Sequence, residues 1–68
     1  MDRTVNTGAV YRHYKGNLYR VLYIAKHTET MEDLVVYVNV EDESHVWARP
    51  ISMWNEPVGD TVRFLKVE

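Results

Sequence analysis

The 68-residue sequence contains no cysteine. This absence excludes disulfides, a thiol nucleophile, a thiolate zinc site and an iron–sulfur cluster. With three glycines the chain has no glycine-rich phosphate loop, and its two serines, Ser44 and Ser52, lie in no Gly-x-Ser-x-Gly elbow. The sequence shows no signal-peptide core and no run of about 18 apolar residues, so we expect a cytoplasmic protein without a membrane partner.

What remains is a short chain of 68 residues, 46% of them hydrophobic, which describes one small domain. A domain of about 60 residues buries only about 60% of the surface that its unfolded chain exposes. Nearly every apolar side chain is therefore needed in the core, and little surface is left for a catalytic pocket. The size disfavours an enzyme.

Charge is unevenly distributed along the chain, whose net charge is −2. The balance is +4 over residues 1–26, −7 over residues 27–60 and +1 over residues 61–68. In so short a chain these segments pack together, and opposite charges then attract across neighbouring strands. The acidic total argues against an indiscriminate binder of nucleic acid or anionic membranes.

Short runs of β-branched and aromatic residues predict strands almost throughout, separated by turns at Gly16 and Gly59. Residues 1–8 are polar and predict a flexible tail, and residues 9–68 form a single domain. Ser52 to Asn55 have room for only one 3₁₀ turn before the last strand. The predicted strands cover residues 9–14, 18–26, 34–40, 45–51 and 61–67.

Five short antiparallel strands with one helical turn predict an all-β fold, a small SH3-like barrel. A closed or nearly closed sheet hides edge strands that would promote aggregation. Among the aromatic residues, we expect Tyr14, Tyr37 and Trp54 to be partly exposed. The predicted core consists of Val10, Leu18, Val21, Ile24, Leu34, Val36, Val38, Val46, Trp47, Val62 and Phe64.

Several ordered segments resemble one known family. They are Tyr11 to Tyr19, His27 to Thr30, Val35 to Tyr37 and Trp47 to Pro50, followed by Met53-Trp54 and Arg63-Phe64. Together they resemble DUF1653, a family of short bacterial and phage proteins, over residues 8–65. The resemblance implies an SH3-like barrel and implies no particular activity.

Polar and aromatic residues at strand ends and in loops suggest a ligand-binding surface, because barrels present function there. Arg49 could grip a carboxylate or phosphate, or pair internally with Glu29 or Glu56. The loop after the second strand could bind a ligand, or its threonines could simply hold the turn. The predicted surface consists of His27, Thr28, Glu29, Thr30, Arg49, Pro50 and Trp54.

These residues favour a non-enzymatic binding or accessory module for a protein, peptide or small ligand, as a monomer or homodimer. One alternative is single-stranded nucleic-acid binding, although the net charge disfavours it. The residues that would carry it are Arg12, His13, Tyr14, Lys15, Arg20 and Lys26.

A second alternative is a small hydrolase or nucleotide-processing subunit that uses His27 and Glu29. No cofactor is expected. The three histidines, His13, His27 and His45, lack the local spacing of metal ligands, so no metal site is predicted.

Overall fold

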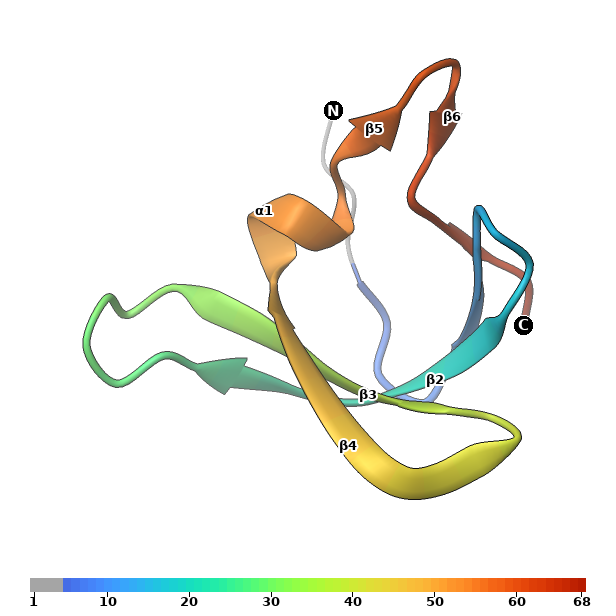
Figure 1. Cartoon of the computed structure of the whole chain (residues 1–68). Coiled ribbons are helices and arrows are strands. Elements are labelled where there is room, and N and C mark those ends of the chain that lie inside the picture. Colours follow the sequence, from blue (N-terminus) through green and yellow to red (C-terminus); the bar gives the residue numbers. More distant parts are fainter. Residues whose placement is uncertain (1–4) are drawn as a thin grey trace.

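The computed structural model describes residues 5–68, and these form a curled antiparallel sheet with a short helix folded against it (Figure 1). Strand order in the main sheet is β4-β3-β2-β1-β7, and β5 and β6 form a separate small hairpin. The elements are β1 Val10–His13, β2 Leu18–Lys26, β3 Asp33–Asn39, β4 Asp42–Pro50, α1 Ile51–Trp54, β5 Pro57–Val58, β6 Thr61–Val62 and β7 Phe64–Lys66.

The predicted all-β class is confirmed, but the sheet does not close into a barrel. Strands β4 and β7 lie at its two edges, and each pairs with one neighbour only within residues 5–68. A register shift between Val21 and Tyr23 interrupts the pairing of β2 with β3. Such a bulge bends a strand and increases its twist, which lets one sheet of this size curl.

The turn between β1 and β2 is the one that the sequence predicts at Lys15 to Asn17. The Gly16 N–H donates to the His13 carbonyl at 2.7 Å, and the His13 N–H donates to the Asn17 carbonyl at 2.8 Å. Gly16 has φ of 110°, a backbone conformation that side chains disfavour. Glycine at this position therefore fixes the reversal.

The turn between β3 and β4 is tighter than predicted. Strand β4 begins at Asp42, which pairs with Asn39, so the gap between the predicted strands 34–40 and 45–51 is wrong in its extent. The Asn39 side-chain oxygen accepts the Glu41 N–H at 2.8 Å and holds the turn. The last predicted strand, 61–67, is also divided into β6 and β7, with Arg63 between them.

The core lies on the concave face of the sheet, where α1 covers it. Trp54 of this helix is 1% exposed and its indole contacts the rings of Tyr11, Tyr37 and Phe64. The expectation that Trp54 and Tyr37 are partly exposed is therefore wrong, whereas Tyr14 is exposed as predicted. A helical turn is present before the last strands, as expected, but it is the α-helical turn α1 at Ile51–Trp54 and not a 3₁₀ turn over residues 52–55. It brings the Trp54 indole back over the sheet.

Several predicted core residues lie outside this core because they belong to the convex face or to the sheet edge. Leu18, Ile24, Val46 and Trp47 are exposed, and their assignment to the core is wrong. Leu34, Val36 and Val62 are partly buried. The assignments confirmed as buried are Val10, Val21, Val38 and Phe64.

The chain before β1 also packs on the sheet from Val5 onward. Val5 is buried in the hydrophobic core, and the Gly8 N–H donates to the Val21 carbonyl at 2.8 Å. The first part of the tail predicted over residues 1–8, up to Thr4, lies outside the described residues. Within residues 5–68, no helix has the length and apolar character needed to cross a membrane.

Candidate functional site

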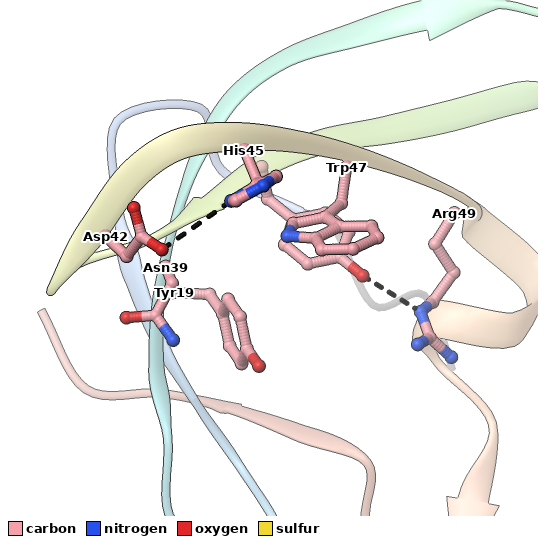
Figure 2. Close-up of a pocket in the computed structure, with 7 residues that line it drawn as sticks. Tyr19, Asn39, Asp42, His45, Trp47 and Arg49 are labelled. Carbon is pink, nitrogen blue, oxygen red and sulfur yellow. Dashed lines mark hydrogen bonds and ion pairs between the residues drawn. The ribbon is translucent and has the colours of Figure 1, made fainter.

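A half-open pocket of about 340 Å³ lies on the concave face, next to the edge strand β4 (Figure 2). Its residues come from three adjacent strands, and β4 contributes most of them. Figure 2 shows Trp47 between His45 and Arg49 along β4, with Tyr19 across the opening. The lining consists of Tyr19, Tyr37, Asn39, Asp42, His45, Trp47 and Arg49.

Aromatic rings form the middle of the pocket. Tyr37 pairs with Trp47 across β3 and β4, and such directly opposite side chains share one face of a sheet. Tyr19 meets Tyr37 edge to face with centroids 5.4 Å apart. Tyr37 is buried, but Trp47 is 52% exposed, so its indole offers open apolar surface beside a rigid aromatic floor.

Arg49 lies at one end of this aromatic floor. Its Nε donates a long hydrogen bond of 3.4 Å to the Tyr37 hydroxyl, and its guanidinium lies over the Phe64 ring at 5.7 Å from the centroid. The predicted internal pair of Arg49 with a glutamate does not form within residues 5–68. Glu56 pairs instead with Arg63, at 2.8 Å.

An acidic group lies at the other end of the pocket. Asp42 accepts hydrogen bonds from the Ser44 hydroxyl and the Ser44 N–H, and these bonds hold the pKa of the Asp42 carboxyl below its usual value. The His45 ring lies 3.5 Å from the Asp42 carboxylate and stacks on Trp47 with centroids 6.1 Å apart. The pocket thus has an anionic end, an aromatic middle and a cationic end.

His13 extends the cationic end along the concave face. Its ring meets Phe64 with centroids 5.0 Å apart and Tyr19 at 6.3 Å. Burial lowers the pKa of the His13 imidazole most, and the positive charges of Arg49, Arg63 and Lys15 lower it further. Several like charges around one ring indicate a positive potential at this end, which favours an anionic ligand group.

The residues predicted to form a ligand surface are only partly brought together. Arg49 lines the pocket, and Pro50, the last residue of β4, pairs with Leu34 beside it. Trp54 lies beside the pocket and not in its lining, since its indole contacts the Tyr37 ring with centroids 5.0 Å apart. Trp54 supports the Tyr37 ring but is only 1% exposed, so it cannot contact a ligand itself.

The predicted binding loop lies apart from the pocket, between β2 and β3. The His27 Nδ1 accepts the N–H groups of Glu29 and Thr30 at 3.1 and 3.3 Å, and the Thr30 hydroxyl accepts the Glu32 N–H at 3.3 Å. The side chains of His27 and Thr30 therefore stabilise the loop by bonding its backbone. The loop meets α1 where Ser52 donates to the Glu32 carboxylate at 3.0 Å.

The basic residues proposed for nucleic-acid binding do not form one surface. Arg12 pairs with Leu18 and Arg20 with Val10, which places both arginines on the convex face. Lys26 forms an ion pair with Asp33, at 2.6 Å, at the far end of β2. The remaining members, His13, Tyr14 and Lys15, lie together at the β1–β2 turn.

Sequence reasoning missed most of the pocket because it assigned Val46 and Trp47 of β4 to the core. His45, Trp47 and Arg49 alternate along the strand, and this spacing of two places them on one face. The presence of a histidine and an arginine in that row was the available signal that the face reaches solvent. Within the described part of the chain, no group of three or more His, Asp or Glu side chains is placed to hold a metal ion.

Comparison with known proteins gives a family and a related structure. The family model described as "Protein of unknown function (DUF1653)" matches residues 9–65. The crystal structure of a DUF1653 protein from Bordetella bronchiseptica is 37% identical, with a TM-score of 0.77 over 91% of this chain and 87% of that one. A comparison with curated proteins found no match.

Proposed function

Because the chain belongs to the DUF1653 family, whose description names no function, we propose from its own pocket that it is a non-enzymatic binding module. The ligand places an apolar or aromatic group against Trp47 and Tyr19 and an anionic group at Arg49. The observation that carries this proposal is the exposure of Trp47, at 52%, beside the buried ring of Tyr37 and the partly buried ring of Tyr19. Tryptophan in such a setting combines a large apolar area with low conformational freedom, and it is a common source of binding energy.

Arg49 supports the anionic half of the proposal. Its guanidinium is oriented by the Tyr37 hydroxyl and the Phe64 ring, which reduces the side-chain entropy lost on binding. Among residues 5–68, no carboxylate forms an ion pair with the Arg49 guanidinium. A planar guanidinium held in this way suits bidentate binding of a carboxylate or phosphate.

The hydrogen bonds of His27 favour binding over catalysis as the function of this protein. A general base needs a ring nitrogen free to take a proton from a substrate. The His27 Nδ1 already accepts two backbone N–H groups of its own loop, which places the proton of the neutral ring on Nε2 and leaves neither nitrogen free to accept another. The Glu29 contact with His27 comes from the backbone and not from the carboxylate, so the pair proposed for a hydrolase has a structural role.

The test is a comparison of captured partners from cell lysate for four proteins. Wild type and the Tyr23→Ala variant, which changes a side chain 69% exposed on β2, should retain the same partner. Trp47→Ala and Arg49→Gln should each lose it, and circular dichroism should show all four folded. A partner captured equally by all four proteins would refute this pocket as the binding site.

A further inference from the structure

Strand β4 lies at an edge of the sheet that no other element of residues 5–68 covers. It is nine residues long, whereas the other edge strand, β7, has three. All residues from Asp42 to Ala48 are exposed, and α1 begins only after Pro50. Within residues 5–68, the backbone of β4 makes its ladder with β3 alone.

The middle of this edge, residues 45–48, lacks the usual protection against strand pairing, whereas the charged residues and Pro50 of β4 lie towards its ends. Natural edge strands carry lysine or proline, are very short, or are covered by another element. Residues 45–48 read His-Val-Trp-Ala, without lysine or proline, and Val46 is 61% exposed. Such an edge presents unpaired N–H and carbonyl groups beside apolar side chains.

The geometry points to an extended peptide segment of a partner protein as the occupant, added to β4 as a further strand of the sheet. This inference rests on the proposed function and names the ligand of the same pocket. Backbone hydrogen bonds to the edge would supply affinity, and pockets for alternate side chains would supply specificity.

The spacing of the pocket residues defines the peptide. Trp47 and Arg49 are two residues apart on one face of β4, and side chains of an added strand alternate with the same period. The residue opposite Trp47 and the residue opposite Arg49 are therefore also two apart. The segment carries an aromatic or large aliphatic side chain at the first position and Asp or Glu at the second.

A second copy of the chain is a poorer occupant of this edge. Two antiparallel β4 strands centred on Val46 would place Glu43 of one copy opposite Arg49 of the other, which suits the charges. The same pairing places His45, not an apolar residue, opposite Trp47. A register shift after Val38 also makes the Asp42 end of β4 irregular, so neither copy offers a straight strand over the full pairing.

The probe is a random heptapeptide library selected on the immobilised wild-type protein. Enriched peptides should share an aromatic or large aliphatic residue followed or preceded, two positions away, by Asp or Glu. Affinity is measured by the fluorescence anisotropy of a labelled peptide, and it should fall by about tenfold or more in Trp47→Ala and in Arg49→Gln. Tyr23→Ala should bind like wild type.

Strand addition is then tested on the peptide backbone. N-methylation is introduced at one peptide position at a time, in the best-binding sequence. Loss of binding at every second position supports strand addition, because only alternate N–H groups face β4. Affinity that depends on Trp47 and Arg49 without this alternation would refute strand addition and leave the pocket proposal standing.

Other results refute one proposal or both. Enrichment of no peptide would overturn the inference of an extended peptide ligand. Peptides that show the alternation but bind Trp47→Ala and Arg49→Gln normally would contradict the pocket itself. A concentration-dependent dimer that Val46→Lys dissociates and Leu65→Lys, on the other edge, does not would assign the edge to a second copy.

Discussion

The Trp54 indole and the Phe64 ring stack with their centroids 3.6 Å apart and their planes 3° from parallel. This contact joins α1, which follows edge strand β4, to β7, the opposite edge strand of the sheet. No ladder of hydrogen bonds connects these two edges within residues 5–68. Aromatic packing on the concave face therefore holds the two edges of the sheet together, as hydrogen bonds between the first and last strands do in a closed barrel.

Trp54→Ala should destabilise the fold far more than Trp47→Ala. Trp54 is 1% exposed and contacts three aromatic rings, so its truncation leaves a large cavity and should cost about 3–5 kcal/mol. Trp47 is 52% exposed, so its truncation leaves no enclosed cavity and should cost clearly less than that of Trp54. Urea unfolding followed by circular dichroism measures both; equal costs would contradict the burial assigned to the two indoles.

The positions of Trp47 and Trp54 also show which features of the fold the sequence predicts and which it does not. Alternation and turn residues are local signals, and they predicted β2 as Leu18–Lys26 and the reversal at Gly16. Which face of a strand becomes the core depends on what folds over it, and four residues of α1 decide that here. The alternation of apolar and polar residues within a strand does not predict where the Trp54 side chain of α1 packs on the sheet.

The candidate site was harder to predict than the fold for the same reason. Arg49 was identified because it is the only basic residue in an acidic stretch, and the structure places it in the pocket. Trp47 was assigned to the core by hydrophobicity alone. Its exposure follows from the position of β4 at an open edge, and the expectation of a nearly closed sheet left no such edge.

Met31→Asn should stabilise the protein by up to about 1 kcal/mol. Met31 has φ of 64°, the left-handed region that costs an ordinary side chain about 1–2 kcal/mol and that asparagine adopts more readily. Its N–H donates to the His27 carbonyl at 2.9 Å, and its side chain is exposed, so the substitution should keep the backbone contact and lose little packing. A lower melting temperature for this variant than for wild type would argue against strain at this turn.

Stability should decrease as the pH falls below about 6.5, in part because of His13. The pKa of the folded-state imidazole lies below its ordinary value of 6.5, so the unfolded chain takes up a proton at a higher pH than the folded protein does. The contribution is fully present above the unfolded pKa and is lost as the pH falls towards the folded one. Thermal unfolding of wild type and His13→Gln between pH 8 and 5 measures it, and the variant should show the shallower decline.

Arg49→Gln should raise the pKa of His13 towards its ordinary value. Burial is the larger cause of the lowered pKa and remains in the variant, so the return should be partial. Arg49 is the leading charged contributor, because its guanidinium and the His13 ring both lie against Phe64. Titration of the His13 ring protons by NMR gives the pKa directly.

Arg12→Gln serves as the matched control for this titration, because it removes an arginine next to His13 in sequence but on the convex face. The sheet lies between the convex-face guanidinium and the imidazole, so the pKa of His13 should change less than in Arg49→Gln. Equal shifts in the two variants would mean that the net charge of the protein sets the pKa. A shift confined to Arg49→Gln would locate the positive potential at the end of the pocket where the anionic group of the ligand is expected to bind.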